Sequence, residues 1–211
     1  VYGWSRLQAV CSAKNEADRK QKRVEKKIRR NLNKLEEENR RLQKMVEEKE
    51  NKLQLPSIRH NPLLEIIPIG SGCMGQCSYC ITKNARGKHY SYPIEDIIER
   101  IKKAINEGVK EIYLTSQDTG CWGLDIGKNL PELLKAVCEV PGEHMIRLGM
   151  ANPNHVLKYL KPITEALKHE RMYKFIHLPV QSGNNYVLED MQRNYTAEDY
   201  FHIISHLKKE I

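Results

Sequence analysis

The sequence predicts an α/β protein, a partial (β/α) barrel that is truncated after about four β/α units and preceded by a long basic helix. Two observations lead to this fold class. Short apolar runs alternate four times with amphipathic segments from residue 64 onward, an order that builds a parallel sheet with right-handed crossovers. Residues 13–54 contain no Gly or Pro and consist mainly of helix formers. We therefore divide the chain into a basic helical arm, residues 1–54, and a core, residues 55–211.

Length and composition suit a globular protein with an appendage. The chain has 211 residues and is 40% hydrophobic, which is enough for one core of ordinary size. No run of about 18 apolar residues is present for a membrane span, and residues 1–10 lack the pattern of a secretory signal. Six cysteines, three of them inside eight residues, do not resemble a secreted disulfide framework. We expect a cytoplasmic protein without a membrane segment.

Positive charge is concentrated in the arm. The formal net charge is +8, and residues 14–52 hold 15 of the 35 Lys and Arg residues but only 9 of the 27 Asp and Glu residues. A basic segment is consistent with a polyanionic partner such as RNA. Runs of this composition are also common on solvated helix surfaces, so that interpretation stays open.

The arm also carries a heptad pattern, in which core residues recur at alternating spacings of three and four. One core position of the heptad holds Leu32, Asn39, Val46 and Leu53. The other core position holds Ile28, Leu35 and Leu42. Asn39 resembles the buried polar residue that fixes register in coiled coils. The pattern fits coiled-coil self-association through residues 28–53, or else a helix that packs on its own core.

Turn and cap residues bound the elements of the core. Strands are expected at residues 64–69, 111–115, 144–150 and 174–180, where short apolar runs lead into polar or glycine-containing turns. Helices are expected at residues 94–107, 131–138, 154–169 with a break near Pro162, and 196–211. Thr196 would cap the last helix. The segments after the strands would gather at one edge of the sheet, where barrel folds place their chemistry.

Cys73, Cys77 and Cys80 follow the first expected strand and form a Cys-x3-Cys-x2-Cys cradle. Zinc is one alternative, but structural zinc usually needs four ligands, and no pairing Cys or His follows at finger spacing. A disulfide is another, and three clustered thiols in a cytosolic chain argue against it. Three thiolates can bind three irons of a 4Fe-4S cube and leave the fourth iron open to a small chelating ligand. The spacing and the position at a strand end favour this iron–sulfur site.

Residues 73–80, CMGQCSYC, resemble the signature of radical S-adenosylmethionine (SAM) enzymes, in which an aromatic residue precedes the third cysteine. From about Leu55 onward the chain resembles the tRNA methylthiotransferases. Within them it is most similar to the archaeal and eukaryotic branch that modifies N6-threonylcarbamoyladenosine next to the anticodon. The stretches that carry the likeness are residues 61–69, 85–87, 114–119, 147–153, 177–183 and 191–195.

This resemblance implies a partial radical SAM core with two cofactors, a 4Fe-4S cluster on the three cradle cysteines and SAM. In such enzymes the cluster reduces SAM to a 5′-deoxyadenosyl radical, which removes the hydrogen at adenine C2 so that a methylthio group can be attached there. The chain would then be a transferase that makes the 2-methylthio product. The implied partners are tRNA and an electron donor protein.

The resemblance also implies, by position, which residues contact the cofactor and the RNA. Tyr79 would pack near the SAM adenine. The SAM amino group would meet Ser116, Gln117 and Asp118, and its ribose or carboxylate side would meet Gln181 and Ser182. Arg147 and Arg193 would bind the SAM carboxylate or an RNA phosphate, and Lys83, Arg86 and Lys88 would bind RNA phosphates. Gln181 and Ser182 could instead cap a strand end, and Arg147 could form a structural ion pair.

The chain departs from the family pattern in two respects. Family members have a preceding domain whose three cysteines hold an auxiliary 4Fe-4S cluster involved in sulfur insertion, and the corresponding region here offers only Cys11. They also continue into further β/α units and an RNA-binding TRAM domain, whereas this chain stops at Ile211. A fragment or divergent isoform, a different radical SAM enzyme and an inert RNA-binding or interaction module therefore stay open. Cys121 and Cys138 match no cluster position, and we expect both to be buried.

Overall fold

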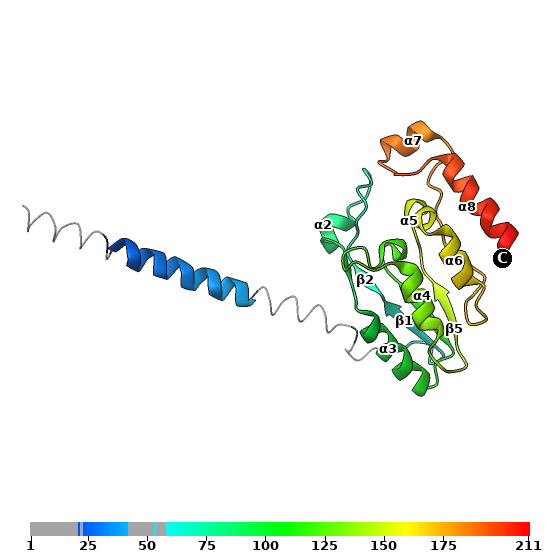
Figure 1. Ribbon diagram of the computed structural model, residues 1–211, viewed down its shortest axis with the longest axis horizontal. Helices are drawn as coiled ribbons and strands as arrows, with labels where there is room; N and C mark the ends of the chain where they lie inside the picture. Colours follow the sequence, from blue (N-terminus) through cyan, green and yellow to red (C-terminus); the bar gives the residue numbers. More distant parts are fainter. Residues whose placement is uncertain (1–20, 22, 42–52, 54–57) are drawn as a thin grey trace, which may run out of the picture. The chain divides into compact units, whose positions relative to one another are not determined.

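A parallel sheet forms the centre of the fold in the computed structural model, which describes residues 21, 23–41, 53 and 58–211 (Figure 1). Its three strands are β1 (Leu64–Pro68), β4 (Glu111–Thr115) and β5 (Met145–Leu148), in the order β1-β4-β5. Leu64 pairs with Glu111, and Glu111 pairs with Met145, so the strands are in step and their carboxyl ends meet at one edge. The first three predicted strands and the α/β class are confirmed.

The fourth predicted strand, residues 174–180, does not form a regular ladder. It pairs through one isolated parallel bridge, between Met150 and His177, while a second bridge, between Ile146 of β5 and Met172, lies just before it. Near the start of the predicted strand, the Phe175 N–H donates to the Tyr173 carbonyl (2.7 Å), a tight turn that interrupts the extended conformation. The segment therefore lies next to β5, as expected, without a continuous strand.

Helices cover one face of the sheet (Figure 1). Neighbouring helices contact one another in the order α3 (Ile94–Asn106), α4 (Leu130–Cys138), α6 (Leu160–Leu167) and α8 (Ala197–Glu210). The short helix α5 (Pro153–Lys158) follows β5 in sequence and contacts α6 and α8. Alternate strand residues point toward this layer, since the side-chain period of a strand is two. The fully buried core includes Ile67, Ile112, Leu114, Ile146 and Leu148 from the strands and Ile97, Ile101, Leu133, Leu134 and Ile163 from the helices.

Caps and prolines set the helix boundaries. Thr196 begins α8 with a capping box, because the Asp199 N–H donates to Thr196 Oγ1 (3.1 Å) and the Thr196 N–H donates to Asp199 Oδ2 (2.9 Å). This cap was predicted, and it is confirmed. The interruption predicted near Pro162 is present but lies three residues earlier, at Tyr159. Pro162 falls in the first turn of α6, where a missing N–H breaks no intrahelical bond.

Short elements that the sequence pattern does not reveal surround the carboxyl edge of the sheet. β2 (Gly70–Ser71) pairs antiparallel with β3 (Tyr90–Ser91), and α2 (Thr82–Arg86) lies between them in sequence. A 3-10 turn, η2 (Thr119–Cys121), follows β4, and α7 (Asn185–Asp190) precedes α8. Elements of two to six residues are too short to show a hydrophobic period.

The chain divides into two compact units, Val1–Lys52 and Leu53–Ile211. In the first unit the described residues are helical and exposed, and Ile28, Leu32 and Leu35 of the heptad stripe are each more than half exposed. Leu42 and Val46 of the stripe, together with Cys11, lie outside the described residues. The assignment of Leu53 to the stripe is wrong, because its side chain is 4% exposed in the core of the second unit.

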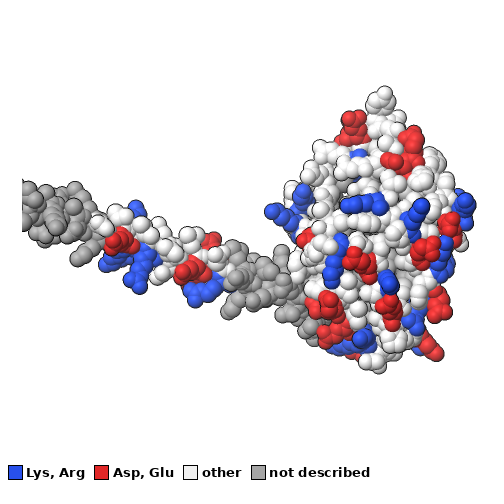
Figure 2. Space-filling view, viewed as in Figure 1, with Lys and Arg blue, Asp and Glu red and all other residues white. Residues whose placement is uncertain are grey.

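Charge differs between the two units. In the first unit, residues 23–41 carry eight Lys and Arg against four Asp and Glu. On the visible face of the second unit, basic and acidic side chains are interspersed (Figure 2). None of the helices in the described part of the chain combines the length and the apolar run that spanning a bilayer requires.

Candidate metal centre

The three cradle cysteines lie between β2 and α2, in a loop that follows the carboxyl end of β1. Cys73, Cys77 and Cys80 are free thiols that line one cavity of about 410 Å³. The same cavity is lined by Gly75, Gln76, Thr82, Lys83 and Asn84. Three unpaired thiols facing one space fit a cluster that takes three thiolate ligands and keeps one iron open.

Hydrogen bonds from the loop itself reach two of the cradle sulfurs. The Gly75 N–H donates to Cys73 Sγ (3.2 Å), and the Thr82 hydroxyl oxygen lies 3.1 Å from Cys80 Sγ. Burial raises the pKa of the Cys73 thiol, whereas the hydrogen bonds with Thr82 lower the pKa of the Cys80 thiol. The thiolate, the form that binds metal, therefore forms more readily at Cys80 than at Cys73.

The chain returns to the cradle at residues 190–195, more than a hundred residues later in the sequence. Ser78 donates from its N–H (3.1 Å) and its hydroxyl (2.8 Å) to carbonyls at the end of α7. Arg193 donates from NH1 to Cys77 Sγ at 3.0 Å and from NH2 to Asn152 Oδ1. The cradle and the 191–195 stretch, which the sequence singled out separately, thus form one site.

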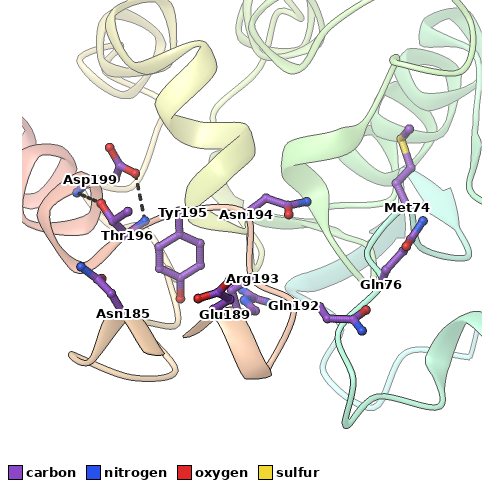
Figure 3. Close-up of a pocket in the computed structure, with 10 residues that line it drawn as sticks. All are labelled: Met74, Gln76, Asn185, Glu189, Gln192, Arg193, Asn194, Tyr195, Thr196 and Asp199. Atoms are coloured by element: carbon purple, nitrogen blue, oxygen red, sulfur yellow. Dashed lines mark hydrogen bonds between the residues drawn. The ribbon is translucent and has the colours of Figure 1, made fainter. Parts of the chain in front are cut away.

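A larger cavity of about 790 Å³ opens beside the cradle (Figure 3). Met74 and Gln76 of the cradle loop line one side, and Tyr195 and Thr196 line the opposite side. Its other lining residues are Asn185, Glu189, Gln192, Arg193, Asn194 and Asp199. A neighbouring cavity of about 230 Å³, bounded in part by the same residues, reaches Cys77, Asn152 and His155. This mostly polar space next to the thiols suits a polar small molecule.

Asp118, at the end of β4, is fully buried and accepts two hydrogen bonds on each oxygen. Oδ1 accepts from the N–H groups of Gly120 (2.9 Å) and Asn152 (3.0 Å), and Oδ2 accepts from Asn152 Nδ2 (2.6 Å) and His155 Nδ1 (2.9 Å). Burial alone would raise the pKa of this carboxyl, but His155 and Asn152 outweigh it and the pKa lies below its usual value. Asp118 therefore joins β4 to the start of α5.

Ser116 and Gln117 also follow β4, and each carries a buried oxygen. Neither Ser116 Oγ nor Gln117 Oε1 has a hydrogen-bond partner among the described residues. Buried polar atoms without partners cost free energy and are uncommon in native structures. These two oxygens could accept hydrogen bonds from a ligand.

The remaining predicted cofactor residues lie closer to solvent. Tyr79 is 54% exposed at the rim of the cradle. Gln181 is exposed with φ 65°, and the Ser182 N–H donates to the Val180 carbonyl (2.8 Å), which closes a strained three-residue turn. A backbone held in this region at a sheet edge is typical of ligand-binding loops.

The predicted RNA contacts fall into two environments. Lys83 and Arg86 on α2 and Lys88 after it are all exposed. The Arg147 guanidinium instead lies between two aromatic rings, 4.9 Å from the centroid of Tyr113 and 4.5 Å from that of Phe175. A cation this near to two ring centroids is held by cation–π attraction, a role that the sequence did not suggest.

Cys121 and Cys138 are buried, as predicted. Burial raises the pKa of both thiols, that of Cys138 to about 11. The ligand atoms of Cys121, Asp118 and His155 lie within 4.8 Å of one another, as in a possible metal site. Both Asp118 oxygens already accept hydrogen bonds from the protein, so the cradle is the better candidate.

Sequence reasoning missed Asn152 and His155, which tie the end of the sheet to Asp118 and Arg193. The available signal was the Asn-Pro-Asn turn at residues 152–154, directly after a strand. It indicated a helix start but not a network, since the partners lie 34 to 41 residues away in sequence.

Residues 67–211 match the Radical SAM superfamily, and the chain belongs to this superfamily. The chain is also similar to curated proteins that share one enzyme name. The chain is 49% identical over 160 residues to the threonylcarbamoyladenosine tRNA methylthiotransferase of Drosophila melanogaster and 48% identical over 161 residues to that of Homo sapiens. It is 47% identical over 159 residues to a probable threonylcarbamoyladenosine tRNA methylthiotransferase of Pyrococcus abyssi. The alignments cover 75–76% of this chain but only 28–37% of the relatives.

Solved structures share the fold at low sequence identity. The radical S-adenosylmethionine methyltransferase TsrM from Kitasatospora setae matches with a TM-score of 0.56 at 15% identity, over 70% of this chain and 29% of its own. The cobalamin-dependent S-adenosylmethionine radical enzyme OxsB matches with a TM-score of 0.55 at 16% identity, over 66% and 21%. The likeness concerns the fold alone, and together with the superfamily match over residues 67–211 it confirms the predicted partial radical SAM core.

Proposed function

We propose that this chain is the radical-generating part of a transferase that attaches a methylthio group to N6-threonylcarbamoyladenosine in tRNA, at adenine C2 next to the anticodon. The observation that carries the proposal is the set of three free thiols, Cys73, Cys77 and Cys80, that share one cavity. The relatives named as tRNA methylthiotransferases, at 47–49% identity, support the choice of substrate.

The two proposed cofactors are a 4Fe-4S cluster on the cradle and SAM in the adjoining cavity. Together, when reduced, they supply a carbon radical strong enough to remove hydrogen from an unactivated carbon. The protein binds and orients SAM. The unpartnered oxygens of Ser116 and Gln117 suit the SAM amino group, a donor that needs acceptors. Arg193 Nε, buried and without a partner among the described residues, suits the SAM carboxylate.

The other cofactor contacts follow from position. We assign Tyr79 to the SAM adenine, and Gln181 with Ser182 to the ribose or carboxylate side. Asp118 acts differently from the sequence-based assignment, because its two oxygens are already occupied by four donors. In this proposal Asp118 fixes the loops around SAM and does not contact the SAM amino group itself.

The central experiment measures both products of the proposed reaction. The reconstituted chain is incubated anaerobically with SAM, a chemical reductant, inorganic sulfide as the sulfur source and tRNA that carries threonylcarbamoyladenosine, and nucleosides are analysed by mass spectrometry. We expect 5′-deoxyadenosine that requires both SAM and reductant, together with the methylthio nucleoside. Release of 5′-deoxyadenosine alone would limit the chain to radical generation and would contradict methylthio transfer by this chain, and release of neither product from cluster-loaded chain would contradict the whole proposal.

We propose that RNA phosphates bind the exposed basic residues of and after α2, namely Lys83, Arg86 and Lys88. Replacing all three with Ala is expected to weaken tRNA binding and to reduce the slope of log K against log salt by about 2 to 3, because three phosphate contacts are lost. Binding assays over a series of salt concentrations measure this slope. The matched control replaces Lys102, Lys161 and Lys208, which are exposed on other helices. Equal losses in both triple variants would contradict the assignment.

Arg147 requires a separate proposal. Its guanidinium is stacked between Tyr113 and Phe175, yet the side chain keeps partial exposure on the sheet face opposite the helices. We propose that Arg147 contacts RNA, as an arginine whose position the two rings fix. An electron donor protein and a cytoplasmic location complete the proposal, since the reaction consumes electrons and needs tRNA.

We propose that the arm pairs with the arm of a second copy. Ile28, Leu32 and Leu35 are exposed on one helix, and Asn39 continues the stripe as a polar residue that can pair with its own copy. Replacing Leu32 with Glu is expected to convert a dimer to a monomer in sedimentation experiments, since a charge would enter the apolar seam. Asn33→Glu, the same charge beside the stripe, is the control. A wild-type monomer would contradict this pairing.

A further inference from the structure

The Arg193 side chain bridges the cradle and the end of the sheet. NH1 donates to Cys77 Sγ at 3.0 Å, and NH2 donates to Asn152 Oδ1. The guanidinium carbon also lies 5.3 Å from the centroid of the Tyr195 ring. Contacts to three different residues therefore fix the guanidinium, and one of them is to a proposed cluster ligand.

Asn152, the second partner of Arg193, is itself fixed by Asp118. Asn152 is 8% exposed, and its Nδ2 and N–H groups donate to the two oxygens of the fully buried Asp118 carboxylate (2.6 Å and 3.0 Å). Because the amide nitrogen is held by a carboxylate, the amide oxygen must face Arg193. A continuous relay of hydrogen bonds thus runs from the buried Asp118 carboxylate through Asn152 and Arg193 to the cradle sulfur of Cys77.

A cation at the end of this relay acts on negative charge at the Cys77 sulfur. Hydrogen bonds that involve an ionised donor are about twice as strong as neutral ones, and partial burial of Arg193 strengthens the attraction further. A reduced iron–sulfur cluster carries one more negative charge than its oxidised form. Hydrogen bonds and positive charge at its sulfurs therefore stabilise the reduced form and raise the reduction potential.

We propose that Arg193 is a positioning residue of the metal centre, which orients Cys77 and raises the reduction potential of the cluster held by the cradle. The inference rests on one part of the proposed function, that the cradle holds a cluster, and does not depend on the RNA substrate. It also gives NH1 and NH2 a task separate from that of Nε, which faces no protein partner among the described residues.

A redox titration of the reconstituted chain, followed by electron paramagnetic resonance, tests this role. Arg193→Met removes the charge and both donors, and we expect its midpoint potential to fall by at least about 59 mV, a tenfold change in the one-electron equilibrium. Arg193→Lys keeps the charge but loses the planar fork, so a smaller shift in the same direction is expected. Lys161→Met makes the same charge change on the exposed surface of α6 and should leave the potential unchanged.

The outcomes separate this inference from the proposed function. Wild-type chain that binds no iron overturns the proposed function, and the inference with it. If the wild-type chain holds a cluster, and the midpoint potentials of Arg193→Met and Arg193→Lys both equal that of the wild type, the inference alone is overturned. A fall of equal size in Lys161→Met also overturns it, because the effect would then come from net charge. If Arg193→Met does not fold, Arg193→Lys carries the comparison, and an unchanged potential in that variant counts against the role.

Discussion

Replacing Cys77 with Ala is expected to reduce iron in the anaerobically reconstituted chain from about four atoms per chain to fewer than about one. The reason is the cradle itself, in which three free thiols line one cavity and each is a proposed ligand. With two thiolates left, a second iron of the cluster would lack a protein ligand, and the cluster would bind too weakly to stay in the chain. Iron and sulfide analysis, together with the visible absorbance of the cluster, gives the measurement. Cys73→Ala and Cys80→Ala should behave in the same way.

Cys138 provides the matched control for this loss. It is a free cysteine that is 4% exposed on α4, away from the cradle cavity. Cys138→Ala removes a buried thiol and is expected to keep its full iron content. Iron retained by Cys77→Ala would contradict the cradle as the metal centre and would direct attention to the group formed by Asp118, Cys121 and His155.

Glu65→Ala is expected to destabilise the second unit by about 3–5 kcal/mol. Glu65 lies on β1 with its side chain 2% exposed, and Arg100 of α3, 7% exposed, donates to it from Nε (3.0 Å) and NH2. Arg59 donates to the other carboxylate oxygen. Removing the carboxylate takes two hydrogen bonds and an adjacent negative charge from the buried Arg100 guanidinium, so the desolvation of that charge is offset less well.

Urea denaturation followed by circular dichroism measures the free energy of unfolding. The control is Glu143→Ala, which breaks an ion pair with Lys110 on the surface, where the carboxylate is 94% exposed. That change is expected to alter stability by less than about 0.5 kcal/mol. Similar losses in Glu65→Ala and Glu143→Ala would contradict the account of the buried pair.

The Glu65 carboxyl group should also make the free energy of unfolding depend on pH. Burial works against ionisation, but hydrogen bonds from Arg100 and Arg59 outweigh it and hold the pKa of Glu65 below its usual value of 4.5. A folded-state pKa below the unfolded one stabilises the protein above pH 4.5, and that contribution is lost as the pH falls through the folded value. Glu65→Gln should therefore lose less stability on acidification than the wild type. If Glu65→Gln lost as much stability on acidification as the wild type, the pH dependence would have to come from other groups.

The sequence was a good guide to the parallel core, because each strand there is a short apolar run bounded by turn residues. β4 was predicted at residues 111–115, where it lies, and the α8 cap at Thr196 was recognised from its polar side chain and the acidic residues that follow. The fourth strand was only partly right, since a local turn between Tyr173 and Phe175 competes with the ladder. Periodicity does not report such a turn.

The site was predicted unevenly, for reasons of sequence distance. The cradle lies within eight residues, so its spacing alone revealed it. The contact of Arg193 with Cys77 joins residues 116 positions apart, and only the folded chain shows it. For Asp118 the residue was recognised but not its role, because its four donors come from the loop after β4 and the start of α5.

The central claim is that Cys73, Cys77 and Cys80 hold a cluster with an iron open to SAM. Electron paramagnetic resonance of the reduced, reconstituted chain with and without SAM tests it most directly. We predict a 4Fe-4S signal whose shape and position change when SAM is added, because SAM would bind at the iron that the three cysteines leave open. The absence of a 4Fe-4S signal, or a signal that SAM leaves unchanged, would contradict the claim.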